Sequence, residues 1–297
     1  MKVFITGANG FVGSALSGFF SECGHEVFAL VRNPSKAVGL PTSVKIVLGD
    51  PSKPGKWQED LHKYDLFINL AGASIFHRWN DDYKKLIRNS RINTTKNLVQ
   101  AIPSNTTLLS TSAVGYYGMK GDEELDESSK SGNDFLAKVT ADWEAEAMEA
   151  IKKDVRVVIT RFGVVLGPNG GALGEMLRPF KFFVGGPIGN GRQWLSWVHV
   201  KDLCRAAMFV TAHPEIQGPV NFCAPNPIRN RDLARHIGDI LGRPSFLPAP
   251  GFIINLILGE FGSVILKGQK VLPKKLLSHG FSFNFPDIKS ALIDLLV

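Results

Sequence analysis

Short apolar runs alternate with amphipathic stretches through the first two thirds of the chain. Turn-forming residues bound the apolar runs, as they bound the strands of a buried sheet, and the stretches between them repeat apolar residues at helical spacing. The strands we expect are Lys2–Ile5, Glu26–Val31, Lys45–Val47, Leu66–Leu70, Thr107–Thr111 and Arg156–Arg161, and the helices between them include Phe11–Cys23, Asp81–Ala101 and Phe135–Ile151. This alternation predicts the α/β class, with a doubly wound parallel sheet between two layers of helices.

The pattern changes from about Asn169, where Gly, Pro and aromatic residues become frequent, as in Gly185–Trp194. Such a segment is typical of loops that carry a binding site. Helices are expected after it at Val200–Thr211, Arg231–Leu241, Ile253–Gly259 and Ser263–Gln269. We expect residues 1–168 to form the sheet domain, which later strands can extend to about residue 225. Residues 169–297 should form a substrate loop and a small C-terminal substrate or lid lobe, since these pieces are too small for an independent domain of usual size.

Composition narrows the class of protein without changing this outline. The 297 residues suffice for a large core, and the charged fraction of 21% is ordinary for a soluble globular chain. The three cysteines, Cys23, Cys204 and Cys223, are far apart and form no Cys-x-x-Cys pair. We therefore expect reduced thiols, no metal site and a cytoplasmic location.

The formal charge of +7 raises the question of an anionic partner. Lys and Arg are scattered rather than grouped, so we expect no nucleic-acid partner, and an anionic cofactor with solvated lysines accounts for the excess. No apolar run approaches the roughly 20 residues of a membrane helix, so no membrane partner is expected. Met1 and Lys2 lead directly into a strand, which is not the pattern of a secretory signal.

Three glycines, Gly7, Gly10 and Gly13, stand between the first strand and the first helix. In this context the early glycines let the backbone turn tightly and approach a diphosphate, and the last one lets helix and strand pack closely. The helix N-terminus adds unpaired N–H groups and a positive dipole. The turn therefore predicts a dinucleotide cofactor.

The residue at the end of the second strand, Arg32, bears on which nicotinamide cofactor is bound. An acidic residue there would bind the ribose 2′-hydroxyl, whereas a guanidinium favours a 2′-phosphate. We therefore expect NADP(H) to be preferred over NAD(H). The other interpretation is a solvated arginine at a strand end.

The segment Thr6–Gly13 and four later ones, Asn69–Gly72, Ser110–Gly118, Arg161–Pro168 and Trp197–Leu203, resemble successive motifs of the extended short-chain dehydrogenase/reductase superfamily. The order and spacing of these motifs cover nearly the whole chain. The resemblance implies a Rossmann fold and an NADP(H)-binding protein. It also implies a homodimer formed through the helices after the fourth and fifth strands.

More narrowly, the chain is similar to the NAD(P)-dependent epimerase-like family that carries a carboxy-terminal domain of unknown function. Gly186–Gln193, Leu266–Pro273 and Gly280–Phe283 carry this likeness, and residues 245–297 correspond to the family-specific domain. Members are mostly named by likeness to sugar-nucleotide epimerases, so the resemblance supplies no substrate. The cofactor contacts that we expect are Gly7, Asn9, Gly10, Phe11, Val12, Gly13, Val31, Arg32, Asp50, Leu70, Ala71, Gly72, Ser110, Thr111, Phe162, Gly163 and Val164.

Hydride chemistry in this superfamily uses a tyrosine as general base, a lysine four residues later, and a serine or threonine that holds the substrate oxygen. Ser112 is the candidate for the holding role, although a strand-end hydroxyl often bonds local backbone instead. The tyrosine should follow about 24 residues later, but Phe135–Thr140 contains none, and no tyrosine follows Tyr117. Lys138 remains, either to anchor the cofactor ribose or as a solvated lysine.

Two residues are candidates to replace the missing base. Tyr117 follows the serine strand, and His199 ends the substrate loop and titrates near neutrality. His199 lies between two valines, so a structural role is the competing interpretation. For the substrate we expect contacts from Arg192, Gln193, Trp194 and Trp197, whose donors and rings suit an anionic or carbonyl group, although tryptophans also fill cores.

Two functions follow from these residues. The first is an NADP(H)-dependent oxidoreductase or nucleotide-sugar-epimerase-like enzyme that acts on a small carbonyl or hydroxyl substrate without the usual tyrosine and lysine. The second is a catalytically weak protein that senses NADP(H). Ser112 and the loop with Arg192 favour the enzyme, whereas the missing tyrosine favours the sensor.

Overall fold

A seven-stranded parallel sheet forms the centre of the computed structural model, which describes residues 1–37, 39–168 and 170–297. The strands are β1 (Lys2–Thr6), β2 (Glu26–Val31), β3 (Lys45–Leu48), β4 (Leu66–Asn69), β5 (Thr107–Ala113), β7 (Arg156–Phe162) and β11 (Gly218–Phe222). They lie in the order β3-β2-β1-β4-β5-β7-β11, so the chain winds outward in both directions from β1. The predicted α/β class with a doubly wound sheet is confirmed, and the topological switch point falls between β1 and β4.

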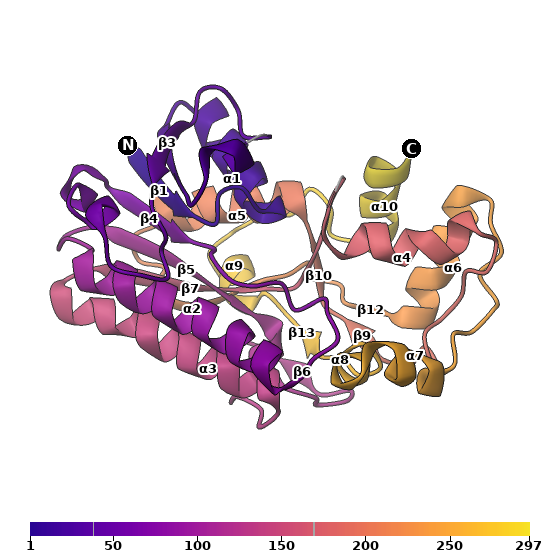
Figure 1. Ribbon diagram of the computed structural model, residues 1–297. Helices are drawn as coiled ribbons and strands as arrows, with labels where there is room; N and C mark the ends of the chain where they lie inside the picture. The colour runs from indigo at the N-terminus through magenta and orange to yellow at the C-terminus, as the bar shows by residue number, and fades with distance from the viewer. Residues whose placement is uncertain (38, 169) are drawn as a thin grey trace.

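Helices cover both faces of the sheet, with α1 (Phe11–Glu22) and α5 (Val200–Ala212) on one face and α2 (Asp81–Ala101) and α3 (Phe135–Met148) on the other (Figure 1). Successive side chains of a strand point to opposite faces. Val3 of β1 accordingly packs in the core under α1 and α5, and Phe4 packs in the core on the opposite side. Because both faces are buried, the strands appear in the sequence as continuous apolar runs.

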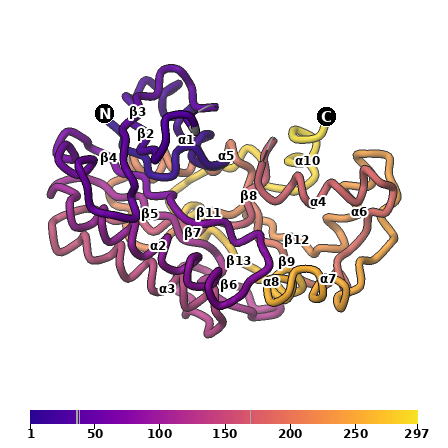
Figure 2. Tube along the Cα trace, in the orientation of Figure 1, coloured from indigo at the N-terminus to yellow at the C-terminus, as the bar shows by residue number. Residues whose placement is uncertain are grey.

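The end of the chain gathers beside the sheet in a second lobe, shown in orange to yellow in Figure 2, except for α5 and α9, which pack on the sheet. The helices of this lobe are α4 (Gly171–Lys181), α6 (Asn230–Leu241), α7 (Gly251–Leu258), α8 (Glu260–Ile265) and α10 (Ile288–Leu296), whereas α9 (Lys274–Ser278) packs against β11. Three short strand pairs lie outside the central sheet. They are β8 (Val164–Leu166) with β10 (Trp197–His199), β9 (Trp194–Leu195) with β12 (Ile228–Arg229), and β6 (Glu124–Leu125) with β13 (Lys270–Val271).

One expectation about the elements needs correction. The seventh strand, β11, falls within the range up to about residue 225 into which the sheet was expected to extend, but α4 occupies a stretch expected to be loop. In α4 the apolar residues Leu173, Leu177 and Phe180 recur at helical spacing and pack into the lobe's core, a pattern hidden among glycines and Pro179. Asn169, where the change of pattern was placed, lies outside the described residues.

Candidate functional site

The turn between β1 and α1 has the close packing that its glycines predict. Gly7 has φ +70°, a conformation that other residues rarely adopt, and a Cβ there would lie 2.8 Å from the carbonyl carbon of Leu70. A Cβ on Gly13 would lie 2.2 Å from the Gly7 carbonyl oxygen. Gly10 is exposed and precedes α1, which has no side-chain cap and no acidic residue in its first turn. The turn thus presents bare helix N–H groups to a ligand.

The expected cofactor residues lie along one edge of the sheet. The glycine turn, Arg32, Leu70–Gly72, Thr111 and Gly163 each stand at or just beyond the carboxyl end of a parallel strand. In doubly wound folds, ligands bind at this edge, beside the switch point. A dinucleotide laid along it would contact the turn, Arg32 and the strand end that carries Thr111, whose buried Oγ1 has no hydrogen-bond partner in the part of the chain described.

Some of these residues have local structural roles. The backbone N–H groups of Leu70 and Ala71 donate to Thr6 Oγ1, at 3.2 and 3.3 Å. Gly163 allows close packing, since a Cβ there would lie 2.8 Å from the Ser196 carbonyl oxygen. The Phe11 ring covers the backbone before α4, so that a Cβ on Gly167 would come within 2.8 Å of it. These contacts fix the shape of the edge.

Arg32 is exposed, and none of the ion pairs recorded for the described residues includes it. Asp50 lies just beyond β3, close enough to Arg32 for the two charges to interact. Burial by itself would raise the pKa of Asp50, but the hydrogen bonds from Ser52 and the Arg32 charge together lower it. The Asp50 carboxylate accepts from the Ser52 N–H and hydroxyl, at 3.0 and 2.8 Å. Arg32 therefore keeps its donors available for a phosphate.

Arg91 on α2 is a second cation at this edge, and it belongs to the run Arg88–Arg91 after the fourth strand, which the sequence suggests could face the cofactor site. Its guanidinium lies against Gly72, where a Cβ would be 3.2 Å from Arg91 Cζ, and 5.3 Å from the centre of the Trp143 ring. It donates to the Ile87 carbonyl of its own helix, and burial lowers its pKa to about 10. A half-buried cation beside the edge, with no carboxylate partner among the described residues, suits an anionic ligand.

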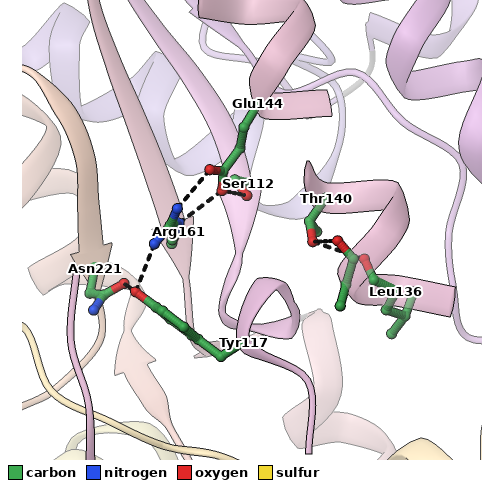
Figure 3. Close-up of polar contacts among 8 residues, drawn as sticks. Ser112, Tyr117, Leu136, Thr140, Glu144, Arg161 and Asn221 are labelled. Atoms are coloured by element: carbon green, nitrogen blue, oxygen red, sulfur yellow. Dashed lines mark hydrogen bonds and ion pairs between the residues drawn. The ribbon is translucent and has the colours of Figure 1, made fainter. Parts of the chain in front are cut away.

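A row of polar side chains crosses three strands beneath the carboxyl edge (Figure 3). Ser112 of β5 is paired in register with Arg161 of β7, and Arg161 with Asn221 of β11. Glu144 of α3 binds Arg161 through both carboxylate oxygens, at 2.7 and 2.8 Å, and accepts from Ser112 Oγ at 2.5 Å. Arg161 also donates to the Tyr117 hydroxyl at 2.9 Å, and that hydroxyl donates to Asn221 Oδ1 at 2.7 Å.

Ser112 and Tyr117, the expected holding residue and a candidate base, are both bonded within this row. Ser112 is 1% exposed and Tyr117 0% exposed, and the hydroxyl hydrogen of each is already donated within the row. Burial also raises the pKa of the Tyr117 phenol. Although burial acts in the opposite sense, the Glu144 carboxylate keeps the pKa of Arg161 above its usual value. The row is thus a closed ionic network that holds α3 on the sheet, rather than a proton donor facing a substrate.

The first turn of α3, where the base was expected, presents apolar and self-bonded groups. Leu136 packs close to the end of β5, since a Cβ on Gly115 would lie 3.7 Å from Leu136 Cβ. One turn on, Thr140 is buried and donates to the carbonyls of Leu136 and Ala137, as Figure 3 shows for Leu136. Lys138 is exposed on the outer side of the helix. This turn therefore carries the lysine candidate without a tyrosine.

His199, the other candidate base, makes contacts with both ring nitrogens. It is 0% exposed, and its Nδ1 accepts from the Lys201 N–H at 3.1 Å, capping α5. Its Nε2 lies 3.2 Å from Asp294 Oδ2 of α10, and its ring stacks on Phe285 with 3.9 Å between centroids. Burial lowers the pKa of His199 despite the carboxylate. A neutral ring is therefore held between α5 and the C-terminal segment.

The four residues expected to contact substrate are placed differently from one another. Trp197 is 0% exposed and donates to the Asn226 carbonyl, so it is a core residue and not a substrate contact. Gln193 donates to the carbonyls of Ile188 and Ile265, and its buried Oε1 has no partner among the described residues. Trp194 is half-buried, and Arg192 is exposed. Only these last two present side chains outward.

Neither a metal site nor a membrane-spanning helix appears among the described residues. They contain no group of three His, Cys, Asp or Glu side chains that could hold a metal ion. None of the described helices is long and apolar enough to cross a bilayer.

The sheet order and the glycine turn define an α/β protein of the Rossmann class. A model of the NAD dependent epimerase/dehydratase family matches residues 3–222, and a model of a domain of unknown function (DUF1731) matches residues 249–295. The chain therefore belongs to the NAD dependent epimerase/dehydratase family, and the family likeness seen in its motifs is confirmed.

Three comparisons place it more closely. The epimerase family protein SDR39U1 homolog, chloroplastic, of Arabidopsis thaliana is 40% identical, over 98% of this chain and 86% of that protein. The crystal structure of human epimerase family protein SDR39U1 (isoform2) with NADPH is 32% identical, with a TM-score of 0.86 over 99% of both chains. MoeE5 in complex with UDP-glucose and NAD is 19% identical over 99% of this chain and 96% of that one, and its TM-score of 0.81 shows the fold alone.

Proposed function

We propose that this protein binds NADP(H) along the carboxyl edge of the sheet and acts as an oxidoreductase or epimerase-like enzyme on a small carbonyl or hydroxyl compound. The observation that carries the proposal is the pairing of the bare glycine turn with Arg32 on the same edge. The human relative with NADPH, similar over 99% of both chains, supports the phosphorylated cofactor. When bound, the nicotinamide supplies or accepts hydride.

The residues present fit this cofactor. The first turn of α1 would hold the diphosphate through backbone N–H groups, and Arg32 would hold the 2′-phosphate. Arg91, buried beside Gly72 without a carboxylate, would take an oxygen of the nicotinamide half. Leu136 and the neighbouring apolar side chains would keep water from the reacting end, which strengthens the polar contacts made there.

The proposal is tested by measuring NADPH and NADH affinities calorimetrically. We expect NADPH to bind at least about tenfold more tightly, because Arg32 gains a charge-assisted bond only with the 2′-phosphate, and Arg32→Asp to reverse the order. Lys138→Asp, on an exposed helix surface, is the control and should leave the ratio unchanged. Equal affinities in the wild type, or no binding of either cofactor, would contradict the proposal.

A second function rests on a specific observation: the first turn of α3, where the base was expected, carries no tyrosine, and its one titratable side chain is the exposed Lys138. A protein that senses NADP(H) needs no base there. The two functions separate in a screen of aldehydes, ketones and nucleotide sugars with NADPH followed at the nicotinamide absorbance. Tight NADPH binding without turnover of any compound would favour the sensor.

A further inference from the structure

Trp143, a buried residue of α3, contacts two side chains of α2 that lead to the candidate cofactor site. Its ring centre lies 5.3 Å from the Arg91 guanidinium. Its indole N–H donates to Thr95 Oγ1 at 2.8 Å. A buried indole needs a partner for its N–H, but here the face of the ring makes a polar contact as well. Because α2 and α3 pack side by side on this face of the sheet (Figure 1), one side chain of α3 reaches both residues of α2.

The Thr95 hydroxyl begins a chain of buried hydrogen bonds that ends at the cofactor edge. Thr95 Oγ1 also accepts from Asn69 Nδ2 at 2.8 Å, and Asn69 Oδ1 accepts from Thr6 Oγ1 at 2.7 Å. Thr6 Oγ1 in turn accepts from the N–H groups of Leu70 and Ala71. Thr6, Asn69 and Thr95 are 0% exposed, so water does not compete for these bonds. The backbone that follows β4 is therefore tied through Thr95 to α3.

The ring contact determines where the Arg91 guanidinium lies. A cation within about 6 Å of the centre of an aromatic ring is attracted to its face. Arg91 Nη1 also donates to the Ile87 carbonyl at 2.9 Å, so the guanidinium is held at two points. It lies there against Gly72, where a Cβ would be 3.2 Å from Arg91 Cζ. An arginine that is fixed in advance loses less entropy when a ligand binds it.

The structure that Trp143 supports lies on one side of the switch point. β4 and β5 lie on one side of β1, and β2, whose end carries Arg32, lies on the other. A dinucleotide that crosses the switch point places one half on each side. With the adenosine 2′-phosphate at Arg32, as proposed, the nicotinamide half lies on the side of β4 and Arg91.

Resting on the proposed function, we infer that Trp143 is a positioning residue for the nicotinamide half of NADP(H). Trp143 is 4% exposed and acts through its two contacts on α2 rather than by touching the cofactor. Its N–H fixes the backbone after β4, whose first two N–H groups are bonded to Thr6. Its ring fixes Arg91, the donor that this part of the edge then offers to a ligand. A tryptophan that only filled the core would support both halves of the cofactor alike.

The test compares, by calorimetry, the affinities for NADPH and for adenosine 2′,5′-bisphosphate, which contains the adenosine half alone. Trp143→Leu removes the ring and the N–H. We expect it to weaken NADPH binding by about tenfold and to leave binding of the bisphosphate within about twofold. Trp143→Phe keeps an aromatic face and removes only the N–H, so it should weaken NADPH binding by about threefold. This second variant carries the test if Trp143→Leu does not fold.

Trp57→Phe is the matched control. Trp57 is also 4% exposed, and its indole N–H donates to the Lys53 carbonyl at 3.1 Å. Both ligands contain the adenosine half, so this variant should leave the ratio of the two affinities unchanged. Arg91→Met is combined with Trp143→Leu, because a residue that acts through Arg91 weakens NADPH binding less once Arg91 has been removed.

Three results would overturn the inference: the Trp143 variants weaken both ligands equally, they leave the NADPH affinity unchanged, or the losses from Arg91→Met and Trp143→Leu multiply in the double variant. The wild type is measured in parallel. If it fails to bind NADPH, the proposed function is wrong. If it binds NADPH and the ratio of affinities stays the same in the Trp143 variants, only the role of Trp143 is wrong.

Discussion

At the scale of single residues, the site depends on how closely the backbone can approach itself and on which side chains are already bonded. Positions 7 and 13 have to be glycine, because a Cβ there would lie 2.8 and 2.2 Å from backbone atoms. Arg161 and Glu144 each need the other, because a buried charge that has lost its partner destabilises the fold. Both requirements can be measured without knowing the substrate.

Gly13→Ala should destabilise the protein by about 1–3 kcal/mol, since the new methyl group meets the Gly7 carbonyl oxygen and the turn must move. NADPH binding should weaken as well. Denaturant unfolding gives the free energy. Gly174→Ala is the control, because a Cβ at that exposed position of α4 meets nothing within 4 Å, and it should be neutral or slightly stabilising. Equal effects of the two substitutions would contradict the steric argument.

Arg161→Leu should cost about 3–5 kcal/mol, because it leaves the Glu144 carboxylate buried with only the Ser112 hydroxyl as donor. Arg88→Leu is the matched control: its ion pair with Asp142 is half exposed, and such pairs contribute under about 1 kcal/mol. Thermal and urea unfolding of both variants measure the difference. If the two losses were similar, the ionic network would not hold α3 on the sheet.

At the scale of elements, the ends of helices explain two features of the site. The N-terminus of α1 has no side-chain cap, so it can bind a ligand, whereas the N-terminus of α5 is closed by His199. The carboxyl ends of the parallel strands all meet at one edge, which brings the turn, Arg32 and the β4–α2 loop together. Because the residue that caps α5 is a histidine, the stability of the protein should depend on pH.

Stability should fall as the pH is lowered from about 7 to about 5.5, because burial lowers the pKa of His199 below its ordinary value of about 6.5. In that window the unfolded chain takes up a proton that the folded protein excludes, which favours unfolding. His199→Asn keeps a capping oxygen and removes the titration, so its melting temperature should depend less on pH. Melting curves at stepped pH values compare the two proteins. The other titratable groups are the same in the two proteins, so their effects cancel in the comparison. If the melting temperatures of the two proteins fell equally with pH, His199 would not be a buried neutral ring.

At the scale of the whole molecule, both apolar contacts and ion pairs attach the C-terminal lobe to the sheet domain. Phe261 of α8 packs on Trp79, while Lys84 and Glu260 form an ion pair at the surface of the same contact. The buried Phe261 ring therefore joins α8 to the segment before α2.

Phe261→Ala should cost about 3 kcal/mol and loosen α7 and α8, because Phe261 is 4% exposed and its ring would leave a cavity. Hydrogen exchange should speed up across residues 251–265 and remain slow in β1 and β4. Lys84→Met, which removes only the surface ion pair, should cost under about 1 kcal/mol. Slow exchange of α7 and α8 in Phe261→Ala would indicate that other contacts attach the lobe.

The sequence by itself determined the layered sheet and the glycine turn, because both depend on local spacing: apolar runs of strand length, helical periodicity, and glycine where strand meets helix. It placed the six strands close to their observed positions. It allowed later strands before about residue 225 without fixing β11, whose partner β7 lies far back in the chain, and it missed α4, whose apolar face is interrupted by glycines.

Only the tertiary structure decided which polar side chains are available for chemistry. Ser112, Tyr117 and His199 look alike in the sequence as candidates, and all three turn out to be buried and bonded to groups far along the chain, such as Glu144, Asn221 and Asp294. Burial and pairing of this kind arise from contacts between distant segments, which no local pattern encodes. Among the described residues, the same contacts left Arg91 without a carboxylate partner.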